Sequence, residues 1–214
     1  MEQTSIGFVG IESPDIALYL ARFYSATGKR VAILDCSELK SLLRLISFDG
    51  TIPDETSYYK NILVLNVDVE CASEIENQDI VIYYFGYNFY AEEIQECTEI
   101  VYVTDMSVSG IQILNEVQVP DDVNEYLIFY NYSSVKYGEK YLLKMFERSL
   151  DEEHIFYLPY DEADYKAMCY LCVDKKHRLS ALSSAMKKVI LEMYLLISGS
   201  TMKRKEQLAI LKQA

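Results

Sequence analysis

The chain has 214 residues, half of them hydrophobic, so it is long enough to build one substantial core, and we expect a single domain. A formal net charge of −13 argues against a nucleic-acid partner, because the phosphates would be repelled. Five cysteines fit a reducing compartment, and neither a charged and apolar leader nor a run of about 18 apolar residues is present. We therefore expect a cytoplasmic protein that is neither exported nor membrane-spanning.

The stretch from Ser5 to Ser37 has the pattern of a strand, a tight turn, a helix and a second strand. Two short apolar runs, one closed by Gly10 and one ending at Asp35, are typical of parallel strands buried on both faces. Between them, Pro14 suits the first turn of a helix and Ser13 can cap it. The pattern predicts a β-α-β unit.

The turn of this unit has the sequence GIESPDI over residues 10–16. The unit resembles the start of the ParA/MinD family of P-loop ATPases, in which the turn carries K-G-G-x-G-K-[ST] and binds phosphates through backbone N–H groups, a lysine and a Mg²⁺-binding hydroxyl. Here the turn has one glycine, no lysine and two carboxylates, and Pro14 removes one N–H donor. The resemblance implies a nucleotide-binding fold, and the residues predict that its phosphate loop has been lost. The vestigial positions of the turn are Gly10, Glu12, Ser13 and Asp15.

The remaining elements follow in an order that also resembles the family, from Ser5 to about Ser198. A loop is predicted over Phe48–Tyr59, where Gly50 and Pro53 interrupt the apolar pattern. The predicted strands are Ile62–Val67, Asp79–Phe85, Glu99–Thr104, Tyr126–Tyr130 and Ile155–Leu158. The predicted helices are Ser37–Ile46, Tyr90–Glu96, a helix that ends near Val117, Lys136–Phe146 and Leu179–Ile197. In the first of these helices, Leu39 is expected on the apolar face.

Three strand ends correspond to nucleotide-site positions of the family. The resemblance implies that Asp35 corresponds to an aspartate that helps to organise Mg²⁺ and the attacking water. Ser37 stands where the family has a second acid, so we favour a helix N-cap or a remnant as the role of both residues. The fourth strand ends in Tyr84-Phe85-Gly86 instead of an aspartate. The resemblance implies that Asn131 contacts the adenine base, and a polar residue capping a turn is the alternative.

The segment Pro159-Tyr160-Asp161 resembles the family's I-P-Y-D sequence and is the most specific match in the chain. Asp161 can cap the next helix, and Tyr165 and Met168 are expected to pack back against the strands. Residues 201–214 form a predicted helical tail that resembles a membrane-surface helix only weakly. Its apolar side is short, so we expect packing or partner contact; the apolar residues are Met202, Leu208 and Leu211.

Cys169 and Cys172 form a C-x-x-C pair with His177 five residues on, a spacing that suits a metal or a redox pair. No second pair completes a zinc site, so we interpret them as packing cysteines and predict no metal site. Of the two histidines, neither lies beside a distinctive nucleophile motif, which argues against nucleophilic catalysis.

Nineteen tyrosines and no tryptophan give the chain a marked aromatic bias. Several of these tyrosines lie at the end of the fourth predicted strand and in the loop that follows it. Ordinary edge packing is one interpretation, and a partner-facing aromatic surface is the other. The candidate interface residues are Phe85, Tyr87, Phe89 and Tyr90.

The predicted fold is a single α/β domain over residues 1–200, with a mostly parallel central sheet and helices on both faces, followed by the tail over 201–214. We predict a non-catalytic pseudo-ATPase without a cofactor. It would act with protein partners, and as a homodimer, as a docking scaffold for a cytoplasmic pilus, secretion, division or motility machine. One alternative is a true ATPase in which a lysine such as Lys29 reaches the phosphates. Another is a peripheral membrane adaptor.

Overall fold

The computed structural model describes residues 3–47, 56–67, 72–134, 138–171 and 178–214. In these residues, one sheet contains eight strands in the order β3-β4-β2-β5-β1-β6-β7-β8. Neighbouring strands are parallel except β3 and β4, which pair antiparallel. The strands are β1 (Thr4–Gly10), β2 (Val31–Asp35), β3 (Ser57–Tyr59), β4 (Ile62–Asn66), β5 (Ile80–Gly86), β6 (Glu99–Thr104), β7 (Asn124–Tyr132) and β8 (Ile155–Pro159).

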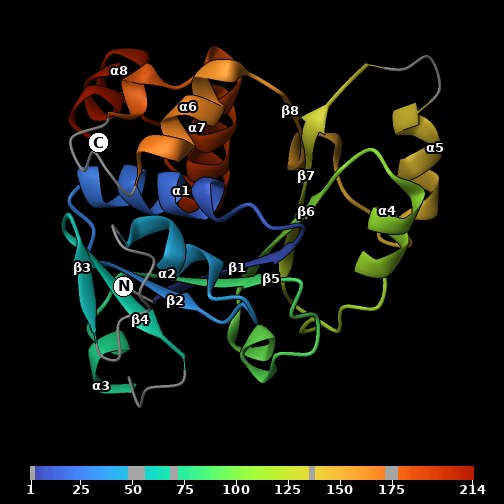
Figure 1. Cartoon of the computed structure of the whole chain (residues 1–214), viewed down its shortest axis with the longest axis horizontal. Helices are drawn as coiled ribbons and strands as arrows, with labels where there is room; N and C mark the ends of the chain where they lie inside the picture. Colours follow the sequence, from blue (N-terminus) through green and yellow to red (C-terminus); the bar gives the residue numbers. More distant parts are fainter. Residues whose placement is uncertain (1–2, 48–55, 68–71, 135–137, 172–177) are drawn as a thin grey trace.

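Helices cover both faces of the sheet (Figure 1). The α-helices are α1 (Pro14–Ala26), α2 (Ser41–Ile46), α3 (Ala72–Ile75), α4 (Val108–Leu114), α5 (Gly138–Met145), α6 (Glu162–Tyr170), α7 (Ser184–Ser198) and α8 (Arg204–Gln213). The 3₁₀ helices are η1 (Glu92–Glu96), η2 (Glu152–His154) and η3 (Leu179–Ala181). This arrangement confirms the predicted α/β class with a mostly parallel sheet.

Alternating side chains of each central strand enter two separate cores. Ile80 and Ile82 of β5 face the core beneath α1, α2, α6, α7 and α8, whereas Val81 and Tyr83 face the core beneath η1, α4 and α5. Burial on both sides explains why these strands appear in the sequence as continuous apolar runs. Their carboxyl ends meet at one edge of the sheet, where the turn after β1 also lies.

The predicted loop over Phe48–Tyr59 is wrong at its end, because Ser57–Tyr59 forms the edge strand β3. Residues 48–55 of that prediction lie outside the described residues. The helix predicted from Ser37 begins only at Ser41, after Lys40 adopts a left-handed conformation with φ 48°. Leu39 is therefore exposed instead of lying on the apolar face of the helix.

The helix predicted over Leu179–Ile197 is divided into η3 and α7. Ser183 causes the division: its hydroxyl accepts a hydrogen bond from Met186 N and caps α7, as expected of serine at a helix start. Gly199, with φ 60°, ends α7 in the left-handed conformation common at helix ends. Among the residues that the structure describes, no helix is long and apolar enough to cross a membrane.

Candidate functional site at the carboxyl edge of the sheet

The turn after β1 is held tightly against the end of β6. Ile11 N donates a hydrogen bond of 2.9 Å to the carbonyl oxygen of Val103. Gly10 has φ 131°, and a Cβ atom at this position would overlap the same carbonyl group. A glycine is therefore required here, because any side chain would push the turn away from β6.

The carboxylate of Glu12 folds inward over the end of β5. It accepts hydrogen bonds from the hydroxyl of Ser41 and from the phenol of Tyr84, the latter at 2.8 Å. Gly86, with φ 52°, leaves room for it, since a Cβ atom there would lie 2.5 Å from Glu12 Oε1. The turn thus places its own anion at the carboxyl edge of the sheet.

The N–H groups of the turn are largely bonded within the chain. Ser13 N donates to the Tyr84 phenol oxygen at 2.9 Å, and Ile16 N donates to the Ser13 carbonyl at 3.2 Å. Ser13 does not cap α1 through its side chain as predicted, because its hydroxyl donates instead to the carbonyl of Ile11. Pro14 has no N–H to offer. Few donors of this turn remain for a phosphate.

Asp15 is buried in the first turn of α1. Burial raises the pKa of its carboxyl to about 6, with a smaller contribution from the nearby charge of Asp164 and opposing contributions from the backbone N–H groups of Asp15 and Ile16. Its Oδ1 has no hydrogen-bond partner among the described residues. Asp15 is thus a buried acid with one unsatisfied oxygen.

Asp35 and Ser37 organise the start of α2. Asp35 accepts hydrogen bonds from the Ser37 hydroxyl at 2.6 Å and from Leu43 N at 2.9 Å, and Ser37 Oγ accepts one from Ser41 N. Burial raises the pKa of the Asp35 carboxyl, although these hydrogen bonds oppose the shift. Both side chains therefore accept hydrogen bonds from N–H groups in the first turn of α2, although the N-cap residue is Lys40 and not Asp35 or Ser37.

Lys29 and Lys40, the lysines on either side of β2, lie at opposite edges of the sheet. Lys29 precedes β2 and therefore lies at the amino edge, a strand length of roughly 17 Å from the turn. Lys40 lies at the carboxyl edge, where its ammonium donates to the carbonyl of Asp35 at 3.3 Å. A lysine that reaches a ligand beside Glu12 would therefore be Lys40 and not Lys29.

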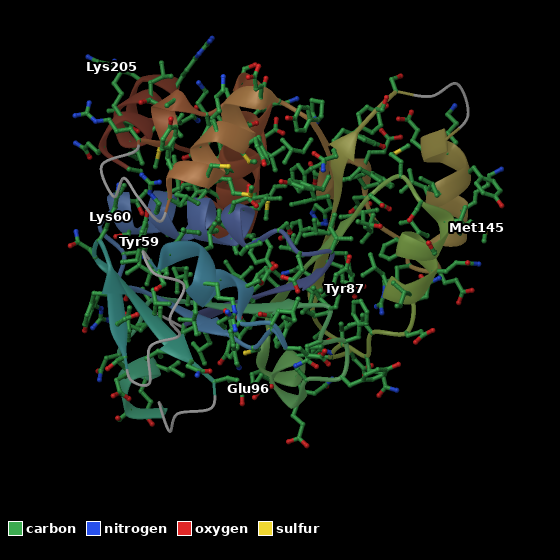
Figure 2. All side chains as sticks on the ribbon, viewed as in Figure 1. Tyr59, Lys60, Tyr87, Glu96, Met145 and Lys205 are labelled. Carbon is green, nitrogen blue, oxygen red and sulfur yellow. The ribbon has the colours of Figure 1, made fainter. Side chains whose placement is uncertain are left out.

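A first pocket of about 270 Å³ lies between the turn and the loop that leads into α4. Tyr87 is half-exposed at its rim, and Figure 2 labels this side chain at the end of β5. Phe85 and Phe89 are buried, so they are not exposed interface residues as predicted; only Tyr87 and Tyr90 of the four candidates are accessible. The chain direction after β5 explains the difference, because Phe85 still points into the core.

A second pocket of about 310 Å³ lies on the other side of Glu12, at the ends of β7 and β8. Asn131 lines it from an irregularity in the pairing of β7 with β8, in a left-handed conformation with φ 55°. Asp161 caps α6 as predicted, by accepting a hydrogen bond from Ala163 N. Tyr165 is exposed at the rim instead of packing back on the strands.

The described residues contain no cluster of three or more His, Cys, Asp or Glu side chains that could hold a metal ion. Cys169 is exposed on α6, whereas Cys172 and His177 lie outside the described residues. Cys36 and Cys97 are buried, and burial raises the pKa of both thiols, as in packing cysteines.

Sequence reasoning missed Ser41 and Tyr84 as hydrogen-bond partners of the turn, and it missed Asp164, which interacts electrostatically with Asp15. Tyr84 carried the best signal, because it lies near the end of a buried strand where the resemblance implies an acid. The other two carried none, since Ser41 lies 29 residues from Glu12 and Asp164 is far along the chain from Asp15.

Known structures share this fold. A ParA family ATPase from Chlorobium tepidum TLS superimposes with a TM-score of 0.61 at 14% identity, covering 88% of this chain and 98% of its own. A chain of the MinC:MinD cell division protein complex from Aquifex aeolicus superimposes with a TM-score of 0.65 at 13% identity, covering 94% and 98%. No protein-family model and no curated protein matches the sequence. The chain therefore has the fold of ParA and MinD structures.

Proposed function

We propose that this protein is a non-catalytic relative of the ParA/MinD ATPases, a pseudo-ATPase that serves as a docking scaffold in a cytoplasmic assembly. The observation that carries the proposal is the Glu12 carboxylate, bound by Ser41 and Tyr84 at the turn where the resemblance places the phosphates of ATP. Phosphate oxygens at this position would meet a fixed like charge. They would also find the N–H groups of Ile11 and Ser13 already bonded.

The docking role rests on apolar surface around the first pocket. Tyr87 is 50% and Tyr90 77% exposed, and Val108 and Ile113 of α4 are partly exposed nearby. Tyrosines that combine a large apolar ring with a hydroxyl are typical anchors of protein interfaces. The resemblance implies partners from cell-positioning machinery, and a second copy of this chain is one of them.

Calorimetry with Mg-ATP tests the proposal. We expect no measurable heat of binding at micromolar protein concentration and no release of phosphate. Lys40→Met serves as the decisive variant, because Lys40 is the lysine at this edge. A micromolar dissociation constant for the wild type that is lost in Lys40→Met or in Gly10→Ala would overturn the pseudo-ATPase proposal. Lys29→Met, at the opposite edge, is the matched control.

A further inference from the structure

The second pocket, hereafter the acidic tyrosine pocket, combines carboxylates with aromatic rings. It is enclosed by the ends of β7 and β8, by α6 and by the start of α7, with Glu12 on the side of the turn. Its volume of about 310 Å³ accommodates a long side chain or a small organic molecule. The lining residues that carry the argument are Glu12, Tyr130, Tyr160, Asp161, Asp164 and Tyr165.

The charge of this pocket is negative on several sides. Glu12 comes from the turn after β1, whereas Asp161 and Asp164 both come from the start of α6. No Lys, Arg or His is present among the described residues that line the pocket. Asp164 is held by Ser183, whose N–H and hydroxyl donate to its two oxygens at 2.7 and 2.6 Å. Its position is therefore defined by the fold and not by the free rotation of a surface side chain.

A fourth acid, Asp15, is buried close enough to the pocket to interact with two of its lining residues. It is 1% exposed, its Oδ1 has no hydrogen-bond partner among the described residues, and it interacts electrostatically with Asp164 and Tyr130, which both line the pocket. Burial and these two acids raise the pKa of the Tyr130 phenol. A buried acid without a full set of donors is costly unless a positive charge is supplied nearby.

Two tyrosines stand at the mouth of the pocket. The ring centroids of Tyr160 and Tyr165 are 6.5 Å apart with an angle of 42° between the planes, and both rings are largely exposed. Aromatic faces attract cations, most strongly a guanidinium that stacks on them. Carboxylates at the base and ring faces at the rim are together the chemistry that recognises an organic cation.

We propose that the acidic tyrosine pocket binds the cationic end of an arginine or lysine side chain from a partner polypeptide. The proposal rests on the proposed function, because it requires this edge of the sheet to be free of nucleotide. The donor set favours an organic over an inorganic cation, since the described residues contain no group of three metal-type ligands. A guanidinium can bond the carboxylates with its planar fork and stack on Tyr165 at once.

Binding of a fluorescent peptide that contains two arginines between glycine and serine residues tests the proposal. Its counterpart with citrulline has the same shape without the charge, so we expect it to bind at least tenfold more weakly. Two variants should weaken arginine-peptide binding by a similar factor: Tyr165→Leu, and Asp161→Asn, in which asparagine can still cap α6.

Matched controls come from the same helix. Tyr170→Leu changes an equally exposed tyrosine of α6 outside the pocket, and Glu162→Gln removes an exposed acid that pairs with Lys166. Both should bind the peptide as the wild type does. Equal binding of the citrulline peptide, or equal weakening by the control variants, would overturn the proposal by reducing it to nonspecific attraction.

Two further titrations separate the source of the cation and the underlying function. In the first titration, agmatine competes with the fluorescent peptide. If agmatine displaces it at the same concentration as the unlabelled peptide does, the pocket is an organic-cation site whose ligand is a free amine. Mg-ATP titrated in the absence of peptide tests the pseudo-ATPase proposal alone. ATP binding with no arginine-peptide binding would refute both proposals, whereas no binding of either ligand would refute only the cation site.

Discussion

Tyr84 is the residue that joins the first turn of the chain to the middle of the sheet. Its phenol donates to Glu12 and accepts from Ser13 N, while burial raises its pKa. The resemblance implies an acid near this point of the strand, and in this chain Tyr84 bonds the turn itself. One substitution of this kind closes the turn only because Glu12 is present to meet it.

The buried carboxyl of Asp15 makes the stability of the folded protein depend on pH. Its pKa is 3.8 when unperturbed and about 6 in the folded protein, so the folded state binds the proton more tightly than the unfolded chain does. The contribution of Asp15 to stability is therefore lost as the pH rises from about 4 through about 6. The full cost above that range is about 3 kcal/mol.

We expect Asp15→Asn to unfold at a higher urea concentration than the wild type at pH 7.5. Its free energy of unfolding should be greater by up to about 3 kcal/mol, and this difference should shrink toward pH 4. Circular dichroism during urea denaturation at several pH values measures it. Asp122→Asn, which changes an exposed aspartate, should stay within about 0.5 kcal/mol at every pH. A difference between Asp15→Asn and wild type that does not vary with pH would contradict the argument.

At the scale of elements, α8 packs against α1 and does not extend away from the domain (Figure 1). Arg22, buried within α1, donates to the main-chain oxygen of Ala214, and Lys60 donates to the same oxygen at 3.1 Å. Figure 2 labels Lys60 and also Lys205 on α8. Leu211 is buried in the shared core, whereas Leu208 is 53% exposed.

These positions predict different costs for two otherwise identical substitutions in α8. Leu211→Ala removes a buried side chain and should lower the free energy of unfolding by about 2 kcal/mol or more. Leu208→Ala, on the exposed side, should change it by no more than about 0.5 kcal/mol. Chemical denaturation of both variants beside the wild type measures the difference.

Flotation with anionic vesicles tests whether α8 binds a membrane surface instead. Because the apolar face of the helix is used against α1, we expect no flotation of the wild type. Flotation that Leu208→Ala abolishes would instead identify α8 as a membrane-surface helix and favour the peripheral adaptor alternative. Equal stability of the Leu208 and Leu211 variants would point the same way.

For the molecule as a whole, the pseudo-ATPase proposal makes a prediction about association. The resemblance to ParA and MinD ATPases implies that bound ATP controls how two subunits meet. If the turn after β1 binds no phosphate, as we propose, association through this face should be indifferent to nucleotide. Tyr87 and Tyr90 are the exposed aromatic residues that would anchor it.

Light scattering after size exclusion tests this expectation. The mass of the wild type, alone and with products of neighbouring genes, should be the same with and without Mg-ATP. The double variant Tyr87→Ser with Tyr90→Ser should lose association, whereas Tyr141→Ser, an exposed tyrosine of α5, should not. A shift driven by nucleotide, or a monomer that gains no mass with any of these products, would count against the docking role.

The apolar pattern of the sequence predicted the order and type of the principal elements, because strands buried on both faces appear as continuous apolar runs and helices as apolar stripes between them. The pattern missed β3, since three residues are too few to form a pattern. It also extended the last long helix across Ser183, because apolar spacing does not show the hydrogen bond by which the Ser183 hydroxyl caps α7. It also identified Asp161 as a cap, because the bonded N–H of Ala163 is only two residues away, but the same reasoning wrongly predicted a side-chain cap at Ser13.

The contacts of the turn and the exposure of the aromatic residues after β5 depend on how the elements pack together. The Glu12 carboxylate is held by Ser41 and by Tyr84, which is 72 residues away, and no local pattern encodes such a pair. Phe85 and Tyr87 differ in exposure because the chain leaves the sheet between them. Periodicity predicts which residues share a face of an element, but the contacts between elements set which charge meets which donor.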